Sequence, residues 1–164
     1  MVLPPPELRP ASPDDPDATR LIGELNAELD ALYRPDDNHF SFDRSEVAED
    51  RGAFFVAFLE GHPVGCGGVR LIGDARAEIK RMYVRPNVRG RGVGRALLNR
   101  LESKASALGA TSLVLEMGDS QPGAHALYRG AGFREIPCWG EYLATPASVC
   151  LGKRISRVGG VGGV

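Results

Sequence analysis

Arg89-Gly90-Arg91-Gly92-Val93-Gly94 is the most informative stretch of this chain. It follows the strand-like run EIKRMYV, residues 78–84, and precedes an amphipathic segment that runs to Leu108. Glycine lets a backbone approach a ligand closely, and the first N–H groups of a helix have no partner within that helix. A strand, a glycine-rich turn and a helix N-terminus therefore predict an anion site that binds a phosphate-bearing cofactor.

Two common nucleotide-binding patterns do not fit this turn. No Lys-Ser/Thr pair follows the glycines, which excludes a Walker loop, and the spacing GxGxxG is absent. The turn also lies in the middle of the chain, after several strands, and not in an opening βαβ unit. A plain tight connection between strand and helix is the simplest alternative. Three glycines in five residues, flanked by arginines, favour the cofactor site.

The rest of the chain predicts one mixed α/β domain over residues 7–156, between a disordered lead-in at 1–6 and a flexible tail at 157–164. Leucines at helical spacing after Ser12-Pro13-Asp14-Asp15 predict a helix that ends near Tyr33. Residues 34–50 read as irregular, with a short helix at 45–50. Strands are expected at 8–10, 53–59, 64–72, 76–84, 112–117, 133–136 and 148–151, and further helices at 92–108 and 121–132. This order predicts a single sheet with helices on both faces.

Composition and charge are ordinary in total but uneven along the chain. The 164 residues are 43% hydrophobic and 25% charged, with no apolar run long enough to cross a membrane and no signal-peptide core. Residues 1–50 hold 13 acidic and 4 basic residues, whereas residues 51–164 hold 8 acidic and 16 basic ones. The basic part would hold an anionic cofactor, and the acidic part would attract a cationic acceptor. The alternative is that surface charge varies along the chain without any relation to ligand binding.

Two longer motifs resemble a known family. The run IKRMYVRPNVRGRGVGRALLNRL, residues 79–101, resembles the acetyl-coenzyme A signature of the GNAT superfamily of N-acetyltransferases, with Arg89, Gly92 and Gly94 in its Arg/Gln-x-x-Gly-x-Gly/Ala slots. The run AHALYRGAGFREI, residues 124–136, resembles the second motif of that family. The resemblance implies a central, mostly antiparallel sheet of six to seven strands with splayed central strands.

The resemblance also implies an activity, which is transfer of an acetyl group from acetyl-CoA to a primary amine. The amine would attack directly through a tetrahedral intermediate, without a covalent enzyme intermediate. The backbone of Met82 to Val84 would pair with the pantetheine arm, and a backbone N–H of Tyr83 or Val84 would polarise the carbonyl. The pyrophosphate would bind at the following turn, which comprises Arg89, Gly90, Arg91, Gly92, Val93, Gly94 and Arg95.

Two residues are the candidates for proton transfer. Glu78 is the candidate general base, acting directly or through water; the alternative is a structural charge network with Lys80, Arg81 or Arg70. Strand alternation predicts that Glu78, Lys80 and Met82 share one face and Ile79, Arg81 and Tyr83 the other. Tyr128 is the candidate general acid at the departing thiolate, and a packed aromatic is the alternative.

The segment 137–142 is aromatic and could line the acceptor pocket or cover a dimer contact, so Glu141 and Tyr142 are candidate acceptor-binding residues. Three cysteines without CxxC spacing argue against a disulfide framework and a zinc site, so Cys138 and Cys150 are expected as small buried thiols in a reducing cytoplasm.

No metal site is expected, and the expected partner is an amine on a small molecule or a peptide, with a homodimer as an option. A non-catalytic acyl-CoA-binding regulatory module is the alternative function. A nucleic-acid binder is disfavoured by the net charge of −1 and by the lack of basic residues interleaved with aromatic ones.

Overall fold

The computed structural model describes residues 4–33 and 44–156. Expectations for residues 1–3, 34–43 and 157–164 lie outside these described residues. The elements, in chain order, are β1 (Glu7–Pro10), α1 (Pro16–Leu32), the 3-10 helix η2 (Arg44–Val47), β2 (Gly52–Leu59), β3 (His62–Gly73), β4 (Arg76–Val84), the 3-10 helix η3 (Pro86–Val88), α2 (Val93–Ala107), β5 (Ser112–Gly118), α3 (Pro122–Gly130), β6 (Arg134–Ile136), the 3-10 helix η4 (Gly140–Ala144) and β7 (Ser148–Arg154).

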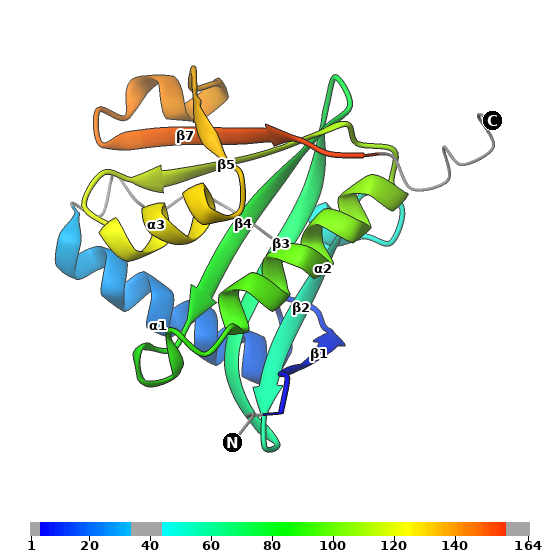
Figure 1. The fold of residues 1–164 in the computed structure, drawn as a ribbon, viewed down its shortest axis with the longest axis vertical. Helices are drawn as coiled ribbons and strands as arrows, with labels where there is room; N and C mark the ends of the chain where they lie inside the picture. Colours follow the sequence, from blue (N-terminus) through cyan, green and yellow to red (C-terminus); the bar gives the residue numbers. More distant parts are fainter. Residues whose placement is uncertain (1–3, 34–43, 157–164) are drawn as a thin grey trace.

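The described strands form one sheet of seven, in the order β1-β2-β3-β4-β5-β7-β6 (Figure 1). Every neighbouring pair is antiparallel except β4 and β5, which are parallel. The β4–β5 pairing covers only Arg76–Ile79 against Ser112–Leu115, although β4 continues to Val84 and β5 to Gly118. Beyond Ile79 the two strands diverge, as Figure 1 shows, so the expected splay of the central strands is confirmed.

Helices cover both faces of the sheet, as the alternation of elements predicts. One core cluster joins α2 and α3 to the sheet, with Leu97, Leu101 and Tyr128 among its buried members. A second cluster packs α1 on the opposite face through Leu21 and Leu25, against Phe54 and Tyr83 among others. The diverging ends of β4 and β5 therefore lie between α1 on one side and the α2–α3 layer on the other.

A β-bulge near the end of β4 overturns the predicted strand faces. The β3–β4 register shifts between Cys66 and Gly68, and Arg81 adopts a positive φ of 55°. A bulge inserts an extra residue and reverses the alternation after it. Met82 consequently packs with Ile79 in the α2-side cluster, while Tyr83 packs in the α1-side cluster. The predicted faces were therefore wrong for Met82 and for Tyr83, because period-2 counting assumes a regular strand.

Candidate active site

A groove runs along the end of β4, the N-terminus of α2 and the start of α3. Its volume is about 640 Å³. The predicted cofactor residues that line it are Met82, Tyr83, Val84, Arg89, Gly90, Gly92, Val93, Gly94 and Arg95; Arg91 is exposed and does not line it. Because β4 has no pairing with β5 beyond Ile79, its backbone from Met82 to Val84 faces this groove as a strand edge.

The glycine turn has the conformation that an anion cradle needs. Gly90 and Gly92 have φ values of 84° and 86°, in the left-handed region that favours glycine. Gly92 is the N-cap residue of α2 and has no side chain to fill the helix mouth. It lines the groove together with the first residues of α2, whose N–H groups have no partner within the helix. A Cβ on Gly94 would lie 2.9 Å from Cδ2 of Leu127, so glycine there lets α2 and α3 approach each other. These residues fit the diphosphate of coenzyme A.

Carboxylates of α1 hold the arginines beside the groove. The Arg89 guanidinium donates to Glu28 at 2.9 and 3.0 Å and to the carbonyl oxygen of Val84 at 2.9 Å. Arg85 donates to both oxygens of Glu24, at 2.9 and 2.7 Å, and this pairing lowers the pKa of Glu24. Glu24 and Glu28 of α1 therefore form ion pairs, which weakens the expectation that they attract a cationic acceptor.

A smaller cavity of about 120 Å³ opens between the diverging strands β4 and β5. Its polar lining comes from Tyr33, Lys80, Arg81, Glu116, Gln121 and Tyr142. Met82 and Tyr128 line both this cavity and the groove, so the two spaces adjoin there. Tyr128 is only 6% exposed, makes an edge contact with Phe133 at 5.7 Å between ring centroids, and has its pKa raised by burial.

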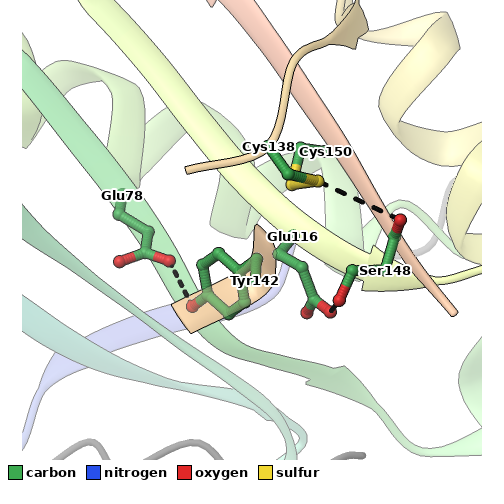
Figure 2. Close-up of a disulfide and its surroundings, with 6 residues drawn as sticks. All are labelled: Glu78, Glu116, Cys138, Tyr142, Ser148 and Cys150. Atoms are coloured by element: carbon green, nitrogen blue, oxygen red, sulfur yellow. Dashed lines mark hydrogen bonds between the residues drawn. A yellow bond between two sulfur atoms is a disulfide. The ribbon is translucent and has the colours of Figure 1, made fainter. Parts of the chain in front are cut away.

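Glu78 lies behind the cavity and not on its wall. The residue is fully buried, and its Oε1 accepts hydrogen bonds from Nε and Nη2 of Arg70 at 3.1 and 2.9 Å. Its Oε2 accepts a hydrogen bond of 2.5 Å from the hydroxyl of Tyr142, which does line the cavity (Figure 2). Burial and the neighbouring Glu78 raise the pKa of Tyr142, so the phenol stays neutral. Tyr142 is thus the structural link between Glu78 and the cavity.

Sequence reasoning missed the three charged residues of the cavity wall. Lys80 is 7% exposed and its Nζ lies 4.0 Å from the Glu141 carboxylate, which is itself half exposed and does not line the cavity. Arg81 donates to the amide oxygen of Asn26 at 3.1 Å. Across the cleft, Glu116 accepts a 2.5 Å hydrogen bond from the Ser148 hydroxyl (Figure 2), and burial raises its pKa. The sequence did contain a signal for these residues, because each is a charged residue inside a strand, β4 or β5, whose other residues are largely apolar.

The expectation of free thiols at Cys138 and Cys150 was wrong. The two sulfurs form a disulfide that links the segment before η4 to β7, with 5.2 Å between the Cα atoms (Figure 2). Spacing alone could not reveal it, because the pairing depends on β7 folding back beside residue 138. Cys66 is a free, buried cysteine, and burial raises its pKa to about 12.

Within residues 4–33 and 44–156, no group of three or more His, Cys, Asp or Glu side chains is placed to hold a metal ion. Among the described helices, none combines the length and apolar character needed to cross a bilayer.

Known proteins similar to this chain identify its family. The sequence model of the Acetyltransferase (GNAT) family matches residues 19–133. A relative from Azospirillum brasilense, named IAA acetyltransferase, is 38% identical over 143 residues, which cover 87% of this chain and 93% of the relative.

Solved structures give the same result. A Klebsiella pneumoniae protein assigned to the acyl-CoA N-acyltransferases has 28% identity and a TM-score of 0.78, covering 92% of this chain and 97% of that one. N-acetylglutamate synthase from Neisseria gonorrhoeae, solved with coenzyme A and N-acetyl-glutamate, has a TM-score of 0.71 at 18% identity. That likeness covers 92% of this chain and 36% of the synthase, and it concerns the fold alone. The chain belongs to the acetyltransferase (GNAT) family and is an N-acetyltransferase that uses acetyl-CoA.

Proposed function

We propose that this enzyme transfers the acetyl group of acetyl-CoA to a primary amine, on a small molecule or a peptide, by direct attack of the amine. The observation that carries the proposal is the meeting of the groove and the cavity at Met82 and Tyr128. A cofactor in the groove would present its thioester at this junction, and an acceptor in the cavity would reach it from the other side.

The residues of the groove would hold acetyl-CoA at its pantetheine arm and at its phosphates. The open edge of Met82 to Val84 suits the pantetheine amides, and the N–H groups at the start of α2 suit the diphosphate. Arg89, Arg91 and Arg95 would add positive charge around the phosphates. The bound cofactor supplies the thioester, whose carbonyl would be polarised by a backbone N–H of Tyr83 or Val84.

Glu78 would remove the amine proton through Tyr142. An amine arrives as an ammonium ion and must lose a proton before it can attack. Tyr142 lines the cavity and donates to Glu78, so its oxygen can accept the amine proton while its own proton moves to Glu78. This arrangement supports an indirect role for Glu78, which lies behind the cavity wall.

Tyr128 would protonate the departing thiolate. Its position at the junction of groove and cavity supports this role, and the pKa raised by burial keeps the phenol protonated at neutral pH. A proton given to sulfur leaves a phenolate, which regains its proton from solvent once coenzyme A departs.

The proposal is tested by measuring free thiol release from acetyl-CoA with a panel of primary amines. We expect turnover with at least one amine, and we expect Tyr128→Phe to lower kcat by about 10²-fold or more while the acetyl-CoA dissociation constant stays within about twofold. Normal turnover in Tyr128→Phe would remove the acid role. Silence across the panel, despite saturable acetyl-CoA binding, would favour the non-catalytic binding module, which the names of the relatives do not favour.

A further inference from the structure

A third space lies on the sheet at the start of β4, away from the groove and the cavity. It has a volume of about 730 Å³ and is lined by residues of β4, β5, β6 and β7. None of its lining residues lines the groove or the cavity. Arg76 begins β4 and Val84 ends it, so roughly 25 Å of extended strand separates this space from the edge that faces the groove.

The strand register brings three arginines to this space, which we call the arginine pocket after Arg76, Arg134 and Arg154. Ser112 of β5 pairs with Arg76 on one side and with Arg154 of β7 on the other. Residues paired across neighbouring strands project from the same face of a sheet, and all three line the pocket in one row. Arg134 of β6 pairs with Gly152 of β7, two residues before Arg154, and lines the pocket from the edge of the sheet.

The floor of the arginine pocket is apolar. Gly152 has no side chain, and a Cβ built on it would lie 3.0 Å from Cδ1 of Ile136 and 3.3 Å from Cγ1 of Val114. These three residues line the pocket between the arginines. An apolar floor offers the guanidinium groups neither a hydrogen bond nor a counter-charge. It also keeps water away from one side of a bound ion, which strengthens the attraction between opposite charges.

The three arginines have no counter-charge in the part of the chain that the structure describes. No described carboxylate lies within ion-pair distance of Arg76, Arg134 or Arg154. The Nε atom of Arg76 is buried and lacks a hydrogen-bond partner among the described residues. Lys153 also lines the pocket, but its Nζ already pairs with Glu102 at 2.6 Å.

One carboxylate borders the arginine pocket. Among the described residues that line it, Glu135 of β6 is the only acidic one, and its side chain is exposed to water. Three guanidinium groups and one exposed carboxylate leave the lining with an excess of positive charge. A buried donor without a partner costs free energy, and a bound ion is one of the ordinary ways of satisfying it. The pocket therefore has the charge and the donors for an anion.

We propose that the arginine pocket binds a small oxyanion that carries two or more negative charges on phosphate or carboxylate groups. Guanidinium groups bind both kinds of oxyanion through paired N–H donors, and the hydroxyl of Ser112 adds another donor between Arg76 and Arg154. A single negative charge would leave part of the cationic lining without a partner, so the multiply charged ligand fits best. The site is separate from the acetyl-CoA groove and does not depend on the acceptor amine.

The only tryptophan of the chain can report on this site. The Arg76 guanidinium lies 5.9 Å from the ring centroid of Trp139, and that ring contacts Tyr142 edge-on at 5.3 Å between centroids. An anion that binds Arg76 changes the charge beside the indole ring. The fluorescence of Trp139 should therefore change on binding, without any need for turnover.

The test titrates the protein with inorganic pyrophosphate and, separately, with citrate, while saturating coenzyme A fills the groove. Calorimetry gives the stoichiometry and the dissociation constant, and the fluorescence of Trp139 gives a second measurement. We expect one anion to bind per chain, with an affinity that falls as sodium chloride is added. The tighter of the two anions shows whether the ligand carries phosphate or carboxylate groups.

Variants locate the bound anion. Arg134→Gln and Arg154→Gln alter exposed side chains and should each weaken binding by at least about tenfold. Arg76→Gln should weaken it as much and should remove the fluorescence change. Arg154→Lys keeps the charge but loses the paired donors, so its affinity should lie between the two. Arg100→Gln removes an exposed cation of α2 that lines none of the three spaces, and it should bind the anion normally.

Two results would overturn the inference. One is the lack of saturable binding of either anion at millimolar concentration. The other is binding that stays unchanged in all three glutamine variants, because the anion would then lie elsewhere on the protein. Neither result bears on acetyl transfer, which thiol release from acetyl-CoA measures separately.

Discussion

At the scale of single residues, Tyr142 has the contacts with the clearest consequences. Its hydroxyl joins the buried carboxylate of Glu78 to the cavity, and Arg70 holds the other carboxylate oxygen. Arg70 of β3 also pairs with Glu46 of η2. The Glu78 carboxylate therefore belongs to a network of charged side chains that comes from β3, β4 and η2. The alternative that Glu78 belongs to a charge network therefore agrees with its contacts, and it is compatible with proton acceptance through Tyr142.

Replacing Tyr142 with Phe should affect both turnover and stability. The change leaves Oε2 of Glu78 buried without this donor, which should lower the free energy of unfolding by about 1–3 kcal/mol. It also removes the proposed proton path, so kcat should fall by about 10²-fold or more. Urea unfolding and thiol release measure the two effects. Trp139→Phe, which leaves the hydroxyl in place, is the control; unchanged kcat in Tyr142→Phe would exclude the relay.

Replacing Glu116 with Gln should stabilise the protein at neutral pH. Burial raises the pKa of Glu116, so the native state binds more protons than the unfolded state between the ordinary and the raised pKa. The stability of the unaltered protein therefore falls as pH rises through that window, and the glutamine variant lacks this loss. Unfolding at several pH values should show the difference growing with pH and then levelling. Glu135→Gln, on the exposed side of β6, should show no comparable gain.

At the scale of elements, glycines set how closely α2 approaches the sheet. A Cβ on Gly65 of β3 would lie 2.8 Å from the carbonyl oxygen of Tyr83 and 3.2 Å from Cγ1 of Val93. Gly23, in the middle of α1, has no heavy atom within 4 Å of a built Cβ. The same substitution should thus have opposite effects at the two positions.

We expect Gly65→Ala to lower the free energy of unfolding by about 1–3 kcal/mol, because β4 and the start of α2 must move. Gly23→Ala should raise it by about 0.5–1 kcal/mol, because alanine loses less backbone freedom in a helix. Urea denaturation of both variants measures these changes. A stable Gly65→Ala variant would mean that α2 packs less closely than the structure indicates.

At the scale of the whole molecule, the uneven charge of the sequence becomes a set of contacts between α1 and the end of β4. Glu24 pairs with Arg85 and Glu28 with Arg89, so the acidic first part of the chain neutralises arginines at the groove. If Arg89 binds the phosphates of coenzyme A as proposed, Glu28 competes with them for the same guanidinium.

Removing this competition should strengthen cofactor binding. The Glu28–Arg89 pair is partly exposed and worth at most about 1 kcal/mol, so Glu28→Gln should tighten coenzyme A binding by up to about fivefold. Affinity in both proteins should fall as salt is added, because the attraction is screened. Calorimetric titration with coenzyme A tests this, with Glu60→Gln in the β2–β3 turn as control. Weaker binding in Glu28→Gln would show that Glu28 orients Arg89 instead of competing for it.

The sequence predicted the order of elements and most of the groove, but little of the cavity. Apolar alternation, the glycine turn and the Pro-initiated α3 are local signals, so the strand ending at Val84 and the helix beginning after Gly92 were found with small boundary errors. The cavity depends on contacts between distant parts of the chain. No local pattern predicts the bulge at Arg81. The contact of Tyr142 with Glu78 and the Cys138–Cys150 bond each join segments that lie far apart in the sequence, and no local pattern predicts such contacts.

The Cys138–Cys150 bond has a practical consequence for anyone who purifies this enzyme. Dithiothreitol in the buffer would reduce this disulfide and add one hydrogen atom to each sulfur. In the reduced protein, the segment that contains Tyr142 is no longer bonded through Cys138 to β7. Preparations made with and without the reagent are different starting materials. Intact-protein mass spectrometry of each batch should accompany any comparison of their catalytic constants.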